Sequence, residues 1–158
     1  MMNLLDLYHK SGTVNIQLEI NEILETNKES MKFGLILTAA EAQELIEARN
    51  RATRSNGRVE LGIEAVKKII AAFCSSSYIN PDDYALTLYE LVEIFYYMKN
   101  ETEDRVGDNE LINLMKEFIN HSCRGSVELL KNRELAFFAD NFKRSHQETG
   151  HSQGDESF

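Results

Sequence analysis

The sequence has few residues that interrupt helices: one proline and eight glycines in 158 residues. So few turn-forming residues favour helices over a β-sandwich, in which short strands are joined by many turns. No apolar run approaches the length that a bilayer span requires. The first ten residues, MMNLLDLYHK, contain neither a basic leader nor an apolar stretch of signal-peptide length. We therefore expect no membrane association.

Cysteines are also scarce, since Cys74 and Cys123 are the only two. Two cysteines make no repeated framework, so we interpret both as reduced thiols and expect a cytoplasmic protein. Phosphate-binding glycine loops are missing, because neither GxGxxG nor GxxxxGK[ST] occurs. An EF-hand loop with Gly107 at its sixth position would place Val106 and Asn113 where oxygen ligands are needed. We therefore expect no metal and no cofactor.

The length and composition are those of a single soluble domain. An apolar content of 42% and a charged content of 27% are ordinary for globular proteins. A chain of 158 residues also buries a full hydrophobic core without disulfides. We place one helical domain over residues 1–145 and a disordered tail over residues 146–158, where almost every residue is polar.

The stretch 81–99 predicts the helix around which the others pack. Asn80 is a suitable N-cap, and Pro81 suits the first helical position because its missing N–H is not needed there. Apolar residues recur at helical spacing over most of the circumference, so only a narrow polar strip remains. The apolar set is Tyr84, Ala85, Leu88, Leu91, Val92, Phe95, Tyr96 and Met98, and the strip contains Glu90, Glu93 and Tyr97.

Other helices are predicted on both sides of this one. Residues 14–20 alternate like a strand, but their continuation contains strong helix formers, so we favour a helix over about 15–28. Thr38-Ala39-Ala40-Glu41 is a capping box, and Asn56-Gly57 ends the helix that it starts. Further helices are expected at 63–74, from Asp108 and from Ser126. The last of these faces the core with Val127, Leu130, either Phe137 or Phe138, and Phe142.

Two short segments have the pattern of strands. Residues 33–37 alternate in polarity, and Val59 and Leu61 lie between Gly57 and Gly62. We therefore expect 33–37 and 58–62 to pair as a two-stranded ribbon supported by the helices. The predicted fold is therefore mainly α. It is a compact bundle of about six helices around the buried helix 81–99, with this minor β ribbon.

The net charge of −9 is not spread evenly along the chain. Residues 82–110 contain nine acidic residues against only Lys99 and Arg105, and this accounts for most of the excess. Such a field repels nucleic acid and attracts a basic partner. The plainer interpretation is a solvated acidic face that keeps the protein soluble.

Four arginines, Arg49, Arg51, Arg54 and Arg58, form a basic run that no acid interrupts. No aromatic residue lies among them, so the run does not resemble a nucleic-acid surface. Two interpretations stay open. The cations complement the dipole at the end of a helix, or they meet the acidic segment 82–110, within one chain or across a homodimer.

Several phrases occur together in one order: GRVELG (57–62), AFCSSSYI (72–79), DY (83–84), EIFYYMKNET (93–102), DNELINLMKEF (108–118) and CRGSVELL (123–130). In this order they are similar to an uncharacterised family of small bacterial proteins, a domain of unknown function. The resemblance covers about residues 30–132. It implies a bacterial, intracellular protein and assigns no activity.

Two functional hypotheses follow from the patterns of residues. The first is a non-enzymatic interaction or regulatory protein whose acidic face receives a basic protein surface. The residues of that face are Glu90, Glu93, Tyr97, Glu101, Glu103 and Asp104. The alternative is a small cysteine-dependent enzyme that uses Cys123 with His121. Arg124 and the start of the last helix lie beside this cysteine, and both features lower the pKa of a thiol.

Overall fold

The computed structural model describes residues 16–155, with side chains as far as His146. In chain order the elements are a helix at 16–25, α2 (Asn27–Ser30), η1 (Met31–Phe33), α3 (Ala39–Ser55), α4 (Glu64–Phe73), η2 (Pro81–Asp83), α5 (Tyr84–Glu101), α6 (Asp108–Asn120), α7 (Val127–Leu129), η3 (Leu130–Glu134) and α8 (Leu135–Asp155). The prediction of a mainly helical fold is confirmed. Within residues 16–155, no helix combines the length and apolarity that a membrane crossing requires.

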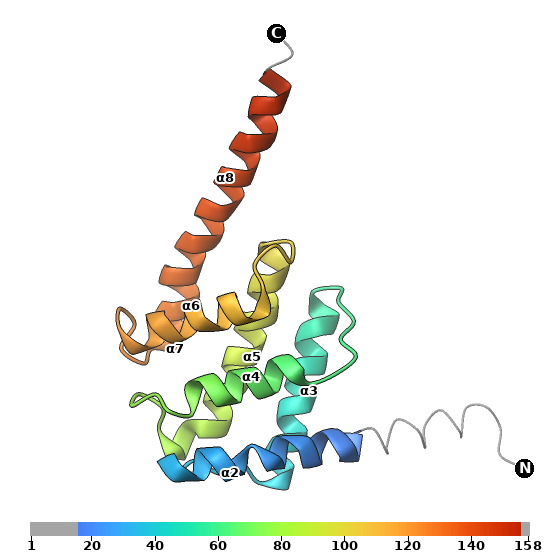
Figure 1. Cartoon of the computed structure of the whole chain (residues 1–158), viewed down its shortest axis with the longest axis vertical. Helices are drawn as coiled ribbons and strands as arrows, with labels where there is room; N and C mark the ends of the chain where they lie inside the picture. Colours follow the sequence, from blue (N-terminus) through green and yellow to red (C-terminus); the bar gives the residue numbers. More distant parts are fainter. Residues whose placement is uncertain (1–15, 156–158) are drawn as a thin grey trace, which may run out of the picture.

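The helix α5 lies in the middle of the molecule and contacts α3, α4, α6, α7 and α8 (Figure 1). Its start is set locally, because the Asn80 side chain accepts a hydrogen bond from the Asp82 N–H at 3.0 Å. Pro81 opens the 3-10 turn η2 that leads into α5. On the inward faces of α5, Leu91 and Phe95 have no exposed surface.

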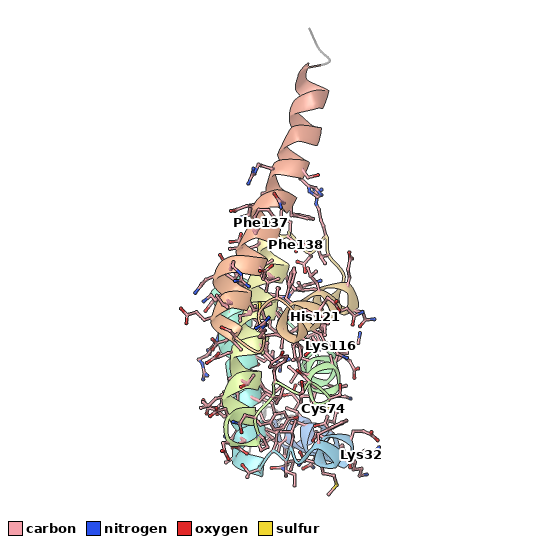
Figure 2. All side chains as sticks on the ribbon, turned by 90° about the vertical axis from the view of Figure 1, so that its left-hand side faces the viewer. Lys32, Cys74, Lys116, His121, Phe137 and Phe138 are labelled. Carbon is pink, nitrogen blue, oxygen red and sulfur yellow. The ribbon has the colours of Figure 1, made fainter. Side chains whose placement is uncertain are left out.

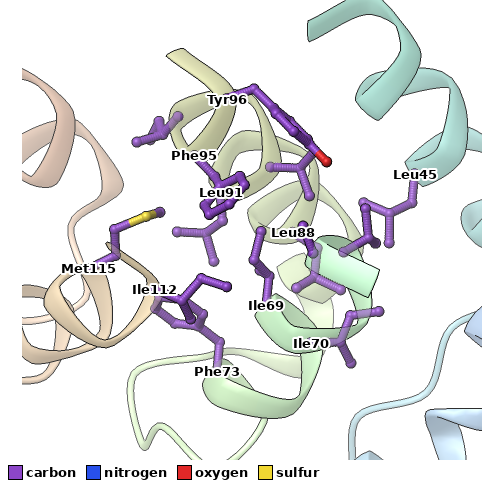
Figure 3. Packing of buried hydrophobic residues seen from close by; sticks show 14 of the residues in the cluster. Leu45, Ile69, Ile70, Phe73, Leu88, Leu91, Phe95, Tyr96, Ile112 and Met115 are labelled. Atoms are coloured by element: carbon purple, nitrogen blue, oxygen red, sulfur yellow. The ribbon is translucent and has the colours of Figure 1, made fainter. Parts of the chain in front are cut away.

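The hydrophobic core is formed where four helices meet. Leu45 of α3, Ile69 and Phe73 of α4, Leu91 of α5 and Met115 of α6 all belong to one buried cluster (Figure 3). Burying a leucine, isoleucine or phenylalanine contributes about 1.5–3 kcal/mol to folding. Because α5 supplies side chains to this cluster from several faces, it packs against helices on several sides.

The capping box predicted for α3 is present. The Glu41 N–H donates to the Thr38 hydroxyl at 3.1 Å, and the Thr38 N–H donates to the Glu41 carboxylate at 2.9 Å. These two bonds satisfy amides that the first turn of a helix leaves unpaired. At the other end Gly57 has a φ of 64°, the left-handed conformation that glycine adopts at little cost.

The predicted ribbon of 33–37 with 58–62 is not confirmed, because the described residues contain no strand. Met31–Phe33 turns as a 3-10 helix instead of extending. The backbone of Leu37 is satisfied by a side chain, since the Asn27 amide both donates to its C=O and accepts from its N–H, each at 2.9 Å. Local hydrogen bonds thus take the backbone groups that a strand partner would have used.

The other half of the expected ribbon is turned with its apolar side chains outward. Arg58 and Glu60 face the molecule, where Arg58 pairs with the loop after α5 and Glu60 accepts a bond from Tyr96. Val59 is 84% exposed and Leu61 is 97% exposed. The side chains of this segment do alternate in polarity, as the sequence indicates. Because the charged side chains have partners within the molecule, they face inward, and the apolar side chains face solvent.

The final helix is continuous through α7, η3 and α8. It starts after Ser126, whose hydroxyl accepts from the Leu129 N–H at 3.1 Å, as the sequence predicts. One turn of it, η3, is a π-helix, in which the N–H of Leu135 bonds to the C=O of Leu130. A π turn brings residues five apart onto one face, and both of these leucines are buried.

The π turn decides which phenylalanine of α8 faces the core. In an uninterrupted α-helix Phe137 would follow Leu130 on the same face after two turns. The extra residue moves Phe138 to that position, where it packs against the core, and leaves Phe137 exposed.

Beyond its packed start, α8 extends away from the other helices (Figures 1 and 2). Helix α8 continues to Asp155, and disorder of the segment 146–158 stays a prediction. Residues 156–158 lie outside the described range. The first turns of α8 are fixed by the buried Leu135 and Ala139. Extending a helix that already exists is far easier than nucleating a new one.

Replacement of a core residue of α5 tests this architecture. We expect Phe95→Ala to lower the free energy of unfolding by about 3–5 kcal/mol, because a cavity remains where the ring was. Leu86→Ala on the same helix is the matched control, since Leu86 is exposed and its loss should change stability by less than about 0.5 kcal/mol. Urea unfolding followed by circular dichroism measures both, and equal effects would contradict the packing.

Candidate functional site

The exposed strip of α5 borders a hollow of about 300 Å³ between this helix and the final helix. From α5 it is lined by Glu90, Glu93, Ile94 and Tyr97, and from the other side by Val127, Glu128, Lys131 and Asn132. Ile94 is buried and Val127 is half-buried, so they form an apolar floor. Tyr97 is 43% exposed. Three of the six residues predicted for the acidic face therefore lie together.

Two further hollows continue along α5. One of about 210 Å³ shares Tyr97, Lys131 and Asn132 with the first. The other, of about 340 Å³, shares Glu101 and Lys143 with the second. Neighbouring hollows have lining residues in common, so the three lie in a row, which we call the α5 groove. The first hollow lies at the end of the groove that carries Glu90.

One wall of the groove is made by the π turn. Lys131 and Asn132 belong to η3, and both line the first and second hollows. A π turn is less favourable than an α turn and occurs often at functional sites in proteins. In the sequence its signal is the spacing of five between the inward-facing Leu130 and Leu135.

The carboxylates of Glu90 and Glu93 have no cationic partner within residues 16–146. Both side chains are exposed in the first hollow, and the same is true of Glu128 on the opposite wall. Lys131 is also without an ion pair among these residues. The first hollow thus combines three unpaired carboxylates and one ammonium group over an apolar floor.

Glu101 is already paired across the groove. Its carboxylate lies 2.6 Å from the Lys143 ammonium, so the pair joins α5 to α8. Hydrogen bonding from Lys143 and then from the Tyr97 hydroxyl lowers the pKa of Glu101. The same bond to the Glu101 carboxylate raises the pKa of Tyr97, since it stabilises the protonated phenol.

The last two residues predicted for the acidic face lie on the loop after α5, where both adopt positive φ values, 53° at Glu103 and 59° at Asp104. Asp104 is 2.6 Å from Arg58 and 3.7 Å from Lys99. Glu103 approaches Arg105 at 3.9 Å and lines the last hollow. Asp104 is therefore occupied within the chain and differs in this respect from Glu90 and Glu93.

Lys99, one of the two bases in the acidic segment, is buried. Its ammonium lies 2.8 Å from the Asp108 carboxylate and donates to the Val106 C=O at 2.7 Å. A buried ammonium requires such partners, because its desolvation is otherwise very unfavourable. The sequence did not predict this buried ion pair, since a lysine within an acidic run is usually a solvent-exposed surface residue.

The basic run separates into four different environments. Arg49 is buried and pairs with Glu19 at 3.1 Å, and Arg51 approaches Glu44 at 3.5 Å. Arg54 donates to a backbone C=O one turn earlier in α3. Only Arg58 meets the acidic segment, and it does so within one chain. The guanidinium of Arg58 also lies 5.7 Å from the centre of the Tyr96 ring.

The residues of the enzyme alternative do not form a reactive pair. Cys123 is 2% exposed, and burial raises the pKa of its thiol. His121 lies on the surface (Figure 2), where its ring is 3.4 Å from the Glu117 carboxylate. A catalytic thiolate needs access and a lowered pKa. The structure gives Cys123 neither property.

The turn that contains Cys123 has a structural explanation. Gly125 has a φ of 85°, and a Cβ added there would lie 2.7 Å from the Cβ of Tyr78. Only glycine fits at position 125, between the end of α6 and the start of α7, because any side chain there would collide with Tyr78.

In the described part of the chain, no three histidine, cysteine or acidic side chains are placed to hold a metal ion.

A family model described as a family of unknown function, DUF6323, matches residues 22–148. The chain belongs to this family. The resemblance seen in the sequence, to a domain of unknown function, is thereby confirmed. The residues that line both walls of the α5 groove lie within the matched range. No curated protein and no solved structure matches the chain.

The ion pair across the groove of this DUF6323 domain gives a pH-dependent prediction. The folded state lowers the pKa of Glu101, so the stabilisation is present above the ordinary value and is lost as the pH falls through the lowered one. We expect Glu101→Gln to reduce stability at pH 7 by less than about 1 kcal/mol, as for other partly exposed pairs. At pH 3 and below the difference from wild type should shrink.

Urea unfolding of both proteins at several pH values measures this effect. Glu110→Gln on α6 removes the same charge from an exposed position without an ion pair in the described residues. A Glu101→Gln difference that grows as the pH falls would contradict the assigned pair.

Thiol labelling tests the environment of Cys123 in the DUF6323 domain. We expect an aromatic disulfide reagent at pH 7 to modify it far more slowly than free glutathione, because the thiol is buried and its pKa is raised. Cys74→Ala, which leaves one cysteine, assigns the signal. In urea the rate should rise to that of an unfolded peptide, whereas rapid labelling of the native protein would restore the enzyme hypothesis.

Proposed function

We propose that this DUF6323 domain is a non-enzymatic interaction or regulatory protein of the bacterial cytoplasm, and that its α5 groove receives a basic segment of a partner protein. The observation that supports this most directly is that Glu90 and Glu93 have no ion-pair partner within residues 16–146. Other carboxylates of the acidic segment, such as Glu101, Asp104 and Asp108, already have a cation of the same chain beside them. Within residues 16–146 neither Glu90 nor Glu93 has such a cation, and both border a hollow.

The groove offers both parts of a protein-binding site. The apolar floor of Ile94 and Val127 provides area that is released from water on binding. Each exposed carboxylate that pairs with a basic partner adds up to about 1 kcal/mol to its affinity, and the carboxylates also raise the association rate of a basic partner and reject acidic ones. From Glu90 to Glu101 the groove follows about 17 Å of helix, which corresponds to about five residues of extended chain.

A second copy of the chain fits this groove less well than a different protein. The basic run is the chain's own concentrated source of positive charge, but Arg49 and Arg58 are engaged within the molecule. The net charge of −9 also opposes association of two copies. A basic segment of another protein has a charge opposite to that of the domain and does not meet this repulsion.

Binding of a short basic peptide tests the proposal. A fluorescein-labelled peptide of alternating arginine, lysine and leucine residues is titrated with the full chain and followed by anisotropy. We expect Glu90→Gln/Glu93→Gln to weaken binding about tenfold, as two favourable charge pairs are lost. Raising the salt from 50 to 500 mM should weaken the binding of wild type, since the pairs are exposed.

The matched control is Glu110→Gln/Glu117→Gln on α6, where both carboxylates are exposed. It changes the net charge by the same amount and leaves the groove intact. If this control weakens binding as much as the groove variant does, the peptide recognises overall charge and the assignment of the groove is wrong. Absence of any binding by wild type at low salt would also refute the proposal.

A further inference from the structure

We infer that the first hollow of the α5 groove receives an arginine side chain of the partner in preference to lysine. The inference rests on the proposed function and specifies the chemistry that the groove recognises. Three features of the hollow lead to it: the spacing of its carboxylates, the position of an aromatic ring and the apolar floor between its walls.

The carboxylates of Glu90 and Glu93 are placed for a ligand with several donors. Residues three apart on a helix are neighbours on its surface, about 5–6 Å apart at Cβ. A guanidinium has five N–H donors in a rigid, planar fork, so one group can bond to two neighbouring carboxylates at once. A lysine ammonium is a compact, strongly hydrated point charge that gains less from this arrangement.

Tyr97 supplies a flat surface one turn beyond Glu93. Its ring is partly exposed in the same hollow, and its hydroxyl is held by the bond to Glu101. A cation over an aromatic face is stabilised by the ring, and arginine, which also stacks, is found there more often than lysine. The ring therefore adds to the preference that the carboxylates establish.

The floor of the hollow suits the stem of the same side chain. Ile94 is buried and Val127 is half-buried between the two walls. Arginine carries three methylene groups that pack on apolar surface while the charged end remains hydrated. An arginine that crosses this floor would therefore place its guanidinium near the strip of α5.

Lys131 on the opposite wall acts against a cationic ligand. It lines the same hollow, is exposed and has no ion pair in the described part of the chain. Its ammonium repels an arriving guanidinium at close range, and its flexible stem lets it turn toward solvent. Lys131→Ala should consequently tighten binding, a result opposite in sign to that of removing Glu90 or Glu93.

The experiment compares four capped peptides, Ala-Ala-X-Ala-Ala, with arginine, lysine, citrulline or norleucine at X. Each is titrated into the full chain, and the amide signals of Ile94 and Val127 are followed by NMR, which measures affinities in the millimolar range expected for one side chain. We expect arginine to bind about tenfold more tightly than lysine, the sum of stacking and a second charge-assisted bond. Citrulline, which has the shape of arginine without its charge, should bind more weakly than both.

Two variants separate the contributions. Tyr97→Leu removes the aromatic face but keeps an apolar side chain, so the affinity for arginine should fall more than the affinity for lysine, and the ratio of the two affinities should fall. Tyr97→Phe should keep the ratio near that of wild type. Circular dichroism and urea unfolding establish that both variants are folded before they are titrated.

The outcomes distinguish the two proposals. Equal binding of the arginine and lysine peptides would overturn the arginine inference while the basic-segment function stands. Tighter binding of citrulline or norleucine would overturn both, because the groove would then be an apolar site. If the arginine peptide shifts signals elsewhere and not at Ile94 or Val127, the first hollow is not the site.

Discussion

The enclosure of α5 is the constraint on which the rest of the structure depends. Helices from both sides of the sequence contact it, and the side chains that they bury include Leu91 and Phe95. A helix packed on most of its circumference has only one strip left for solvent or for a partner. The position of the groove is thus a consequence of core packing, because only that strip is free to line a surface hollow.

The features of the fold that could be predicted from the sequence are those set by interactions between residues close together in the chain. The apolar spacing of α5, the capping box at Thr38 and the caps at Asn80 and Ser126 depend on residues a few positions apart, and the structure contains each of them. The exposed strip with Glu90, Glu93 and Tyr97 follows from the same periodicity. Such features can be predicted because the residues that interact lie within one or two helical turns of each other.

The parts that could not be predicted depend on contacts between distant segments. The predicted two-stranded ribbon is not formed. The Asn27 side chain hydrogen-bonds to the backbone of Leu37 instead, and Arg58 pairs with Asp104 in the loop after α5. The second wall of the groove was missed because it requires the π turn, which a search for spacings of three and four does not detect. The burial of Lys99 was missed for a similar reason, since Asp108 lies nine residues away.

The pairing of Lys99 has an effect on the whole length of α5. Its ammonium and the Arg58 guanidinium neutralise Asp104 and Asp108 at the C-terminal end of the helix. Glu90 and Glu93 have no such ion pair among the described residues, so the unpaired carboxylates of the groove lie toward the start of α5. The groove is therefore electrically asymmetric along its axis. A chain lying in it would have a defined direction, with its most basic residue nearest the start of α5.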